Sequence, residues 1–366
     1  MPKSPVRAVH MALAVVSAAA LSPLLAPTPS LAASAAAASQ VGAPSEAAAS
    51  TEGPVLDRLG GSNRYDTAVE ISSAVWDDGV AFGKHVYIAS GENFPDALAG
   101  GPAAASQGEP LLLVPRTGTL PSVVANEIKR LKPSYITIFG GIGAVSSSMA
   151  TQLKALAGAH EVYREAGSDR YETAMRLANY TTTWSGSTPN YPDIVYLTNG
   201  TTYADALSGG AAAALDGAPL LLTQRDHLND WTAGALAEIK PTIIVVLGGT
   251  GAISTATFNQ AKSYAKSAVR IGGVDRYDTS ARLSKATFPA ATDATEVFLA
   301  NGLSYPDALA ATPAVGVLGD VSLLLTKAAC LPAPPHAEVD RIQPDYVTAL
   351  GGTAAVSDAA LAGKPC

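Results

Sequence analysis

The sequence predicts an α/β protein that consists of three tandem repeats, each a small three-layer domain with a mainly parallel sheet. Two observations support this fold class. Three sequence blocks return in the same order, and a motif built on Arg64 recurs at Arg170 and Arg276, 106 residues apart each time. Within each repeat, short apolar runs alternate with Ala- and Leu-rich stretches of helical spacing. Because this period is long enough for a separate core, we do not expect a solenoid of short repeats.

The first repeat shows the expected elements most clearly. Short β-branched runs at residues 86–89, 111–114 and 135–139 predict strands. These runs are continuous rather than alternating, which is typical of parallel strands that helices cover on both faces. Helical spacing at residues 123–131 and 149–156 predicts two of those helices.

The N-terminal part of the chain differs from the repeats. Residues 1–32 combine a cationic start, an apolar stretch at 11–20 and small residues at 30–32, which is the pattern of a secretory signal peptide. Residues 33–54 are mostly Ala, Ser, Gly and Glu with hardly a large apolar side chain. Such a segment cannot bury enough surface to offset the entropy of ordering, so we interpret it as a flexible linker.

We place the three repeats at residues 55–160, 161–266 and 267–366. The sequence has two cysteines, Cys330 and Cys366, both in the last repeat. In an exported protein such a pair is expected to form one disulfide, with two unpaired thiols as the alternative. Neither cysteine has partners at metal-ligand spacing, so we expect no metal site.

Charge and hydropathy exclude several functional classes. The chain of 366 residues has a formal charge of -7, which becomes -9 once Lys3 and Arg7 leave with the signal peptide. No basic field is therefore available to bind nucleic acid. Although 48% of the residues are hydrophobic and only 15% are charged, no uninterrupted apolar run reaches the roughly 18 residues typical of a transmembrane helix. The low charge density instead indicates burial in several sheets and between repeats.

The first recurring block is expected to begin a helix in each repeat. Its N-caps are Asn63, Asp169 and Asp275, each followed three positions later by an acidic residue that suits a capping box. An arginine follows each cap, although a cation opposes the dipole at a helix N-terminus. These arginines are Arg64, Arg170 and Arg276. Each is therefore expected to have a fixed partner, either a recurring aspartate across a repeat interface or an anionic group of a ligand.

The second recurring block supplies candidate ligand contacts at the carboxyl ends of strands, where α/β sheets place their binding crevices. Its aspartates are Asp96, Asp205 and Asp307, which either complement a helix dipole or contact a ligand. The loops before them contain Asn199 and Asn301, our candidates for sugar contacts.

The third recurring block is a pair of glycines between a strand and a helix. Backbone N–H groups at a helix N-terminus can bind an anion without any charged side chain, while tight strand–helix packing is the alternative explanation. The candidate residues are Gly141, Gly249 and Gly352. Glycine pairs at 100–101 and 209–210 are replaced by Ala311 and Thr312 in the third repeat. If these small residues line a groove, the three candidate sites are not equivalent.

Catalytic signals are scarce, and we expect a protein that is not an enzyme and has no cofactor. The sequence has no G-x-S-x-G motif. The segment from His160 to Arg164 resembles a zinc-binding H-E-x-x-H motif but ends in arginine where the second histidine is needed. The histidines do not recur between repeats, so they do not form a repeated site.

Together the three motifs carry a family resemblance. The combination of (N/D)-R-Y-(D/E)-T-(A/S), (P/A)-D-A-L and Gly-Gly-x-x-Ala-(V/I)-Ser, repeated from about Arg58 to Leu361, resembles the cell wall binding repeat 2 family. The resemblance implies that the three repeats pack as an intramolecular pseudo-trimer, so that the protein is a monomer. It also implies a non-catalytic module that holds exported proteins on a Gram-positive envelope.

The ligand that the resemblance implies is an anionic cell-wall polymer, either teichoic-acid-like or a secondary wall polysaccharide. We therefore expect a secreted protein of the cell wall or extracellular surface that binds this polymer non-covalently through three homologous repeats. Two alternatives stay open: an accessory protein that modifies a wall hydrolase such as an amidase, and an adhesion or solute-binding module.

Overall fold

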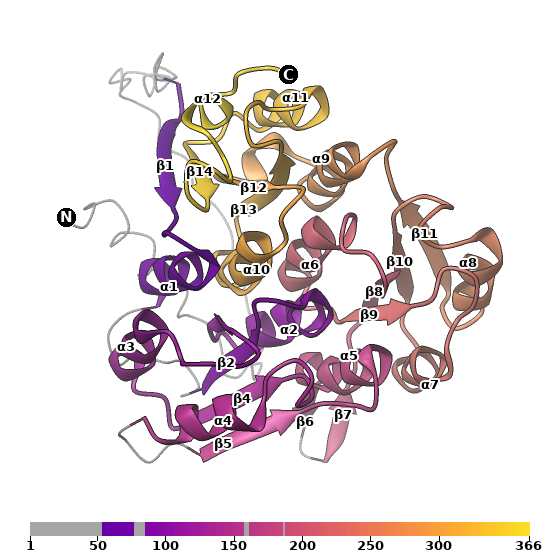
Figure 1. The fold of residues 1–366 in the computed structure, drawn as a ribbon. Coiled ribbons are helices and arrows are strands. Elements are labelled where there is room, and N and C mark those ends of the chain that lie inside the picture. The colour runs from indigo at the N-terminus through magenta and orange to yellow at the C-terminus, as the bar shows by residue number, and fades with distance from the viewer. Residues whose placement is uncertain (1–52, 77–84, 157–160, 186) are drawn as a thin grey trace, which may run out of the picture. The chain divides into compact units, whose positions relative to one another are not determined.

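Three four-stranded parallel sheets form the framework of the computed structural model, which describes residues 53–76, 85–156, 161–185 and 187–366. Helices flank each sheet (Figure 1), as the continuous apolar runs predicted. The expected signal peptide lies outside the described residues, as does nearly all of the expected linker. Within the described residues, no helix is long and apolar enough to cross a membrane.

The first sheet has the strand order β3-β2-β4-β5. Its strands are β2 (His85–Ser90), β3 (Leu111–Val114), β4 (Tyr135–Phe139) and β5 (Glu161–Glu165). The helices of this part of the chain are α1 (Arg64–Val75), α2 (Phe94–Ser106), α3 (Ser122–Leu131) and α4 (Ser147–Lys154). The strands at 111–114 and 135–139 have the predicted bounds. Helix α4 begins and ends two residues earlier than predicted, because Ser146 accepts a hydrogen bond from the Met149 amide and caps it there.

The second sheet repeats this order as β9-β8-β10-β11. Its strands are β8 (Ile194–Asn199), β9 (Leu220–Thr223), β10 (Ile243–Leu247) and β11 (Ser267–Ile271). The helices are α5 (Arg170–Ala178), α6 (Ala206–Leu215), α7 (Asp230–Ile239) and α8 (Thr255–Lys262). This repeat also has a 3-10 turn (Asn179–Thr181) and an antiparallel hairpin of β6 (Thr183–Ser185) and β7 (Thr188–Asn190).

The third sheet has the order β13-β12-β14-β1, so its fourth strand comes from the N-terminal side of the chain. Its strands are β12 (Glu296–Asn301), β13 (Val321–Thr326), β14 (Tyr346–Leu350) and β1 (Val55–Leu59). The helices are α9 (Arg276–Thr287), α10 (Pro306–Leu318), α11 (Ala333–Ile342) and α12 (Asp358–Leu361), with a 3-10 turn at Ala291–Asp293.

Each sheet takes its fourth strand from the sequence repeat that follows it. β5 begins the second repeat but pairs with β4 of the first, and β11 begins the third repeat but pairs with β10 of the second. β1 completes the pattern by pairing with β14, with Leu56 opposite Val347. The three repeats therefore form a closed ring in which every repeat contributes a strand to its neighbour.

Helices α2, α6 and α10, one from each repeat, lie side by side at the centre of this ring (Figure 1). Nearly all of their residues are buried, which agrees with their composition of mostly Ala, Gly and Leu. This packing confirms the expected intramolecular pseudo-trimer. The three helices define its pseudo-threefold axis.

The small residues in the middle of these helices pack on the axis and do not line a groove. A Cβ atom on Gly101 would lie 2.6 Å from Thr312 Cγ2, and the nearest atom to a Cβ on Gly210 would be Thr312 Oγ1 at 3.5 Å. One threonine thus fills the space that the two glycines leave. The replacement in the third repeat is a packing feature, so the condition that these residues line a groove is not met.

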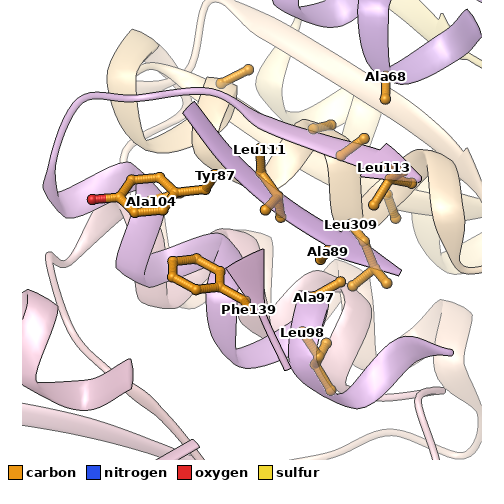
Figure 2. Packing of buried hydrophobic residues seen from close by; sticks show 14 of the residues in the cluster. Ala68, Tyr87, Ala89, Ala97, Leu98, Ala104, Leu111, Leu113, Phe139 and Leu309 are labelled. Carbon is orange, nitrogen blue, oxygen red and sulfur yellow. The ribbon is translucent and has the colours of Figure 1, made fainter. Parts of the chain in front are cut away.

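The hydrophobic core passes from one repeat to the next. The rings of Tyr87 and Phe139 of the first sheet are stacked, with their centroids 4.7 Å apart. Figure 2 shows these two residues with Leu98 of α2 nearby. Leu309 of α10 belongs to the same buried cluster although it lies in the third repeat. The axial helices thus share one core with residues from all three sheets, and the second and third sheets each add a separate buried cluster, which explains why so few of the residues are charged.

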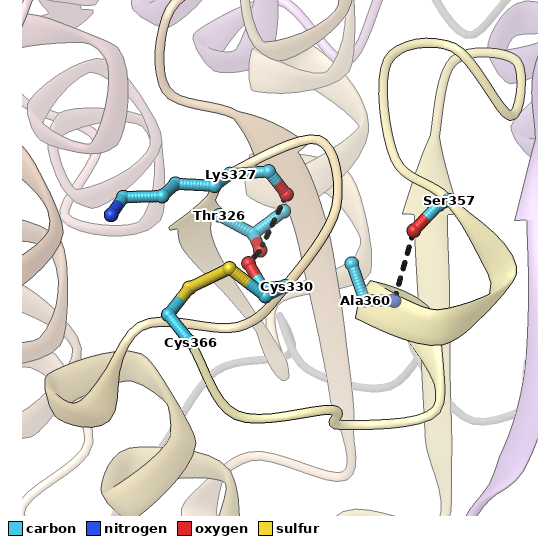
Figure 3. The surroundings of a disulfide bond; sticks show 6 residues. All are labelled: Thr326, Lys327, Cys330, Ser357, Ala360 and Cys366. Atoms are coloured by element: carbon cyan, nitrogen blue, oxygen red, sulfur yellow. Dashed lines mark hydrogen bonds between the residues drawn. A yellow bond between two sulfur atoms is a disulfide. The ribbon is translucent and has the colours of Figure 1, made fainter.

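The expected disulfide is present and links Cys330 to Cys366 (Figure 3). Thr326 Oγ1 donates a hydrogen bond of 3.0 Å to the Cys330 carbonyl, and the Cys366 amide donates one of 3.2 Å to the Leu331 carbonyl. These contacts hold the C-terminal residues against the loop that follows β13.

Candidate functional site

The three predicted N-caps are confirmed, and they set the position of the candidate arginines. The side-chain oxygen of each cap accepts hydrogen bonds from the backbone amides two and three residues later, in α1, α5 and α9. The caps are Asn63, Asp169 and Asp275. Each arginine follows its cap directly and is therefore the first residue of its helix, where its side chain is half-buried.

The acidic residues of the predicted capping boxes bond one residue earlier than expected. Glu172 Oε2 accepts a hydrogen bond of 2.6 Å from the Ser168 amide, which precedes the cap. Asp278 Oδ2 accepts the equivalent bond of 3.0 Å from the Val274 amide. The extended backbone at each cap directs the preceding amide towards the helix. With the Arg176 guanidinium also bonded to it, Glu172 has a pKa lowered to about 2.

The three recurring arginines are each anchored by a backbone carbonyl of their own repeat. Arg170 Nη1 donates a hydrogen bond of 2.6 Å to the Gly200 carbonyl, and Arg276 Nη1 one of 2.5 Å to the Gly302 carbonyl. Arg64 Nη1 bonds the Gly91 carbonyl in the same way. The expected fixed partner was a recurring aspartate or an anionic group of a ligand, and each arginine has in addition a hydrogen-bond partner in the carbonyl of the loop before α2, α6 or α10.

Each recurring aspartate packs against a glycine that directly follows a strand. Asp96 lies against Gly140, Asp205 against Gly248 and Asp307 against Gly351. All three glycines have positive φ, between 84° and 105°, and a Cβ on any of them would collide with the aspartate carboxylate. The close approach of backbone and carboxylate therefore requires glycine at the first position of each Gly-Gly pair.

Burial raises the pKa of two of these aspartates. Asp96 is only 8% exposed, and burial raises its pKa to about 6, although the Arg170 and Arg164 guanidiniums oppose the rise. Burial also raises the pKa of Asp307, opposed by a hydrogen bond with Thr67 and by the Arg64 charge. In both cases the opposing groups come from the next repeat in the ring, so these carboxylates belong to the interfaces between repeats.

A second set of recurring arginines lies at the same interfaces and was missed in the sequence analysis. Arg164 Nη1 donates to the Gly140 carbonyl at 2.6 Å and Arg270 Nη1 to the Gly248 carbonyl at 2.9 Å. Arg58 Nη1 donates to the Gly351 carbonyl at 2.8 Å. The spacing of this set is again 106 residues, a signal that could have identified it.

Each repeat interface therefore combines two arginines of one repeat with one aspartate of the preceding repeat. The first interface contains Arg164, Arg170 and Asp96. The second contains Arg270, Arg276 and Asp205, and the third contains Arg58, Arg64 and Asp307. At each interface the aspartate and one of the two arginines (Arg164, Arg270 or Arg58) contact the same glycine. Each interface therefore places two guanidiniums close to one recurring carboxylate, and at the third interface Arg58 also pairs with Asp358 at 2.9 Å.

The two candidate asparagines are buried and bonded within the protein. Asn199 is 3% exposed, donates to the Ala252 carbonyl at 2.6 Å and accepts from the Thr201 amide at 2.7 Å. Asn301 makes the corresponding bonds to the Ala355 carbonyl and the Leu303 amide. Their geometry fixes the loops that carry the arginine-bound carbonyls.

The second glycines of the Gly-Gly pairs do not begin a helix, contrary to expectation. Gly141 starts a turn in which its carbonyl accepts from the Ala144 and Val145 amides, and α4 begins only at Ser147. Gly249 and Gly352 start the same turn in their repeats. The helix cap is Ser146, whose hydroxyl takes up the amide that an anion would need.

The described residues contain no group of three or more His, Cys, Asp or Glu side chains that could hold a metal ion.

Comparison with known proteins identifies three matching segments in the chain. The cell wall binding domain 2 family matches three segments of the chain, at residues 58–150, 164–258 and 270–361. Two similar relatives are the N-acetylmuramoyl-L-alanine amidase LytC and an amidase enhancer, both of Bacillus subtilis strain 168. LytC is 32% identical over a region that covers 82% of this chain and 56% of LytC. The enhancer is 28% identical over a region that covers 70% of this chain and 32% of the enhancer. The chain thus spans well under two thirds of either relative.

Two solved structures from Clostridium difficile share the fold. Cwp6 superimposes with a TM-score of 0.76 and 25% identity, covering 84% of this chain and 47% of its own. Cwp8 gives a TM-score of 0.71 and 25% identity, covering 82% of this chain and 50% of its own.

Proposed function

Since the chain belongs to the cell wall binding domain 2 family, we propose that it attaches non-covalently to an anionic glycopolymer of a Gram-positive envelope. The family match supports cell wall binding, and the polymer is inferred from the charges at the repeat interfaces. We further propose that the chain is exported by the signal peptide at residues 1–32 and continues through the linker at 33–54 into the repeats at 55–160, 161–266 and 267–366. Its place is then the cell wall or extracellular surface.

The observation that carries this proposal is the set of six arginines at the interfaces. A guanidinium keeps its charge at any physiological pH and presents a planar fork of donors that matches phosphate and carboxylate groups. The hydrogen bond to a glycine carbonyl orients each guanidinium while leaving further N–H groups on it. Pre-oriented arginines bind an anion at a smaller entropic cost than mobile ones.

An acidic protein that binds an acidic polymer needs its positive charge concentrated in one place. The formal charge of -7 repels a polyanion at long range, but screening in about 0.15 M salt limits that repulsion to about 8 Å. Within this distance, the attraction of the interface arginines for the polymer outweighs the repulsion by the net charge. Three linked interfaces also bind a repeating polymer more tightly than one, because later contacts are intramolecular.

The test compares two variants that lose the same charge. Arg64→Gln, Arg170→Gln and Arg276→Gln together remove three interface guanidiniums. Lys129→Gln, Lys262→Gln and Lys285→Gln remove three exposed cations, one from each repeat. The protein is incubated with purified Gram-positive walls, and the bound fraction is measured after sedimentation. We expect the arginine variant to bind at least about tenfold more weakly and the lysine variant to bind like the wild type.

Thermal unfolding of the same variants distinguishes ligand contact from a structural role. Lost binding with an unchanged melting temperature supports contact between the arginines and the polymer. Equal binding by both variants contradicts the proposal, and a large fall in melting temperature assigns the arginines to the interface alone.

The similarity to an amidase enhancer favours a second candidate, an accessory protein that stimulates a separate wall amidase. A turbidity assay with walls and a purified amidase separates the two functions. Attachment alone predicts an unchanged lysis rate when the chain is added, whereas an accessory role predicts faster lysis. Lysis by the chain without amidase would indicate catalysis, which we do not expect.

A further inference from the structure

Three aromatic rings, one from each repeat, meet on the pseudo-threefold axis. The ring centroids of Phe94 and Tyr203 are 5.5 Å apart, those of Phe94 and Tyr305 are 5.8 Å apart, and those of Tyr203 and Tyr305 are 5.3 Å apart. The planes are inclined to one another by 61° to 64° in every pair. The rings thus form a nearly symmetrical triangle, which we call the axial triad.

The axial triad lies at the end of the axial helices where the loops between strands and helices gather. Phe94 begins α2, Tyr305 precedes α10, and Tyr203 precedes α6 by three residues. Each ring is half-buried, so its inner part packs on the core while its outer part reaches solvent. At the other end of the same helices, Ala105, Ala214 and Gly316 meet. Large aromatic side chains therefore occur on the axis only at its loop end.

Two guanidinium groups from the repeat interfaces lie beside the triad. Arg64 Cζ lies 6.0 Å from the centroid of the Tyr305 ring, and Arg276 Cζ lies 5.7 Å from that of Tyr203. Both contacts cross a repeat interface, and both arginines are among those bonded to a loop carbonyl. Each cation is thus held beside an aromatic face, in a position typical of cation–π pairs.

We propose that the axial triad and the arginines around it form one binding site for a single negatively charged sugar unit of the polymer. This inference rests on the proposed function. The C–H groups of a pyranose ring pack on aromatic faces, while its phosphate or carboxylate pairs with a guanidinium. The structure therefore assigns one axial site to each chain, with the interfaces leading into it.

Closing the axis does not by itself require this chemistry. Aliphatic side chains of similar volume fill an apolar gap at little cost in stability. Aromatic rings with a polar outer edge and two cations beside them are instead suited to a ligand that is partly apolar and partly anionic. Tyr203 illustrates the polar edge, since its hydroxyl donates a 3.1 Å hydrogen bond to the Leu303 carbonyl.

The experiment measures affinity and stoichiometry by isothermal titration calorimetry with full-length chain. The probe is a size-fractionated short oligomer released by mild acid from purified Gram-positive walls. The test variant combines Phe94→Leu, Tyr203→Leu and Tyr305→Leu. The control combines Tyr135→Leu, Tyr163→Leu and Trp231→Leu, three exposed aromatic residues that are not part of the triad. A third variant, Tyr203→Phe with Tyr305→Phe, keeps the rings.

We expect one oligomer to bind each wild-type chain. The triad variant is expected to bind at least about tenfold more weakly, while the control and the ring-preserving variant bind within about threefold of the wild type. If the triad variant unfolds, Phe94→Leu and Tyr305→Leu are measured singly, and each is expected to weaken binding by about threefold or more.

Three oligomers per chain, or triad variants with wild-type affinity, would overturn the axial site and leave the proposed function standing. Failure of the wild-type chain to bind the oligomer would overturn both.

Discussion

Arg58 Nη1 donates a 2.8 Å hydrogen bond to the carbonyl of Gly351, a residue 293 positions later in the chain. The bond forms where β1 pairs with β14, and it joins the first repeat to the last. Arg164 and Arg270 make the same bond at the other two interfaces. The same type of hydrogen bond therefore joins each pair of neighbouring repeats, including the first and the last.

Replacing Arg58 is expected to weaken the closure. Arg58→Gln removes the bond to Gly351 and the ion pair with Asp358, and its side chain is only 21% exposed. We expect the free energy of unfolding in urea to fall by about 1–2 kcal/mol, because hydrogen bonds to charged groups contribute at this level. Arg116→Gln, at an exposed position, is the control. Equal unfolding midpoints for the two variants would contradict a stabilising role for the closure.

The axial packing makes a second prediction. Gly101→Ala places a Cβ 2.6 Å from Thr312 Cγ2 and 2.8 Å from Thr312 Cβ, so we expect a loss of about 1–3 kcal/mol of stability. The loss should shrink when Thr312→Gly is added, as a double-mutant cycle measures.

Gly234→Ala in α7 is the matched control for this substitution. The space around Gly234 is open, so we expect a gain of up to about 1 kcal/mol from the better helix propensity of alanine. A cycle without coupling between positions 101 and 312 would show that the axial helices do not pack as described.

Asp96 makes stability depend on pH. Its folded-state pKa of about 6 lies above the unfolded value of 3.8, so the folded state retains a proton that the unfolded state has lost. Its contribution is complete below pH 4 and disappears as the pH rises through 6, by an amount on the order of 3 kcal/mol. We expect Asp96→Asn to abolish this part of the pH profile of unfolding in urea.

The same profile for Asp226→Asn, an exposed carboxylate, gives the background effect of replacing an acid by an amide. An Asp96→Asn protein whose stability follows the wild-type curve between pH 4 and 7 would show that Asp96 is not the group responsible.

The disulfide closes a loop with a sequence separation of 36 residues. The loss of chain entropy in the unfolded state gives this disulfide a stabilising contribution of about 4 kcal/mol. The double variant Cys330→Ser with Cys366→Ser is therefore expected to lower stability by up to that amount. A reductant should lower the melting temperature of the wild type and leave that of the variant unchanged. A reductant effect of equal size on both proteins would mean that the disulfide does not contribute.

The strands that the sequence predicted best are those with continuous apolar runs, such as β3 and β4. Burial on both faces leaves such a run without alternation, and no tertiary information is needed to recognise it. The edge strands β1, β5 and β11 were not predicted, because most of their residues are exposed or half-buried and their partners lie in another repeat. Pairing between strands of different repeats leaves no pattern in the local sequence.

The candidate site was predicted in part. The caps and the helix starts at Arg64, Arg170 and Arg276 followed from local hydrogen-bonding rules. The carbonyl partners of these arginines could not be predicted, since every residue offers a carbonyl and only the fold selects one. The axial triad also needed the fold, because only the ring of repeats brings Phe94 together with Tyr203 and Tyr305.

The most direct test of wall attachment is sedimentation of the wild-type chain with purified Gram-positive walls before and after acid extraction of their anionic polymers. We predict that the chain sediments with untreated walls, stays in solution with extracted walls, and is displaced from untreated walls by the soluble extracted polymer. Equal sedimentation with extracted and untreated walls would contradict the account.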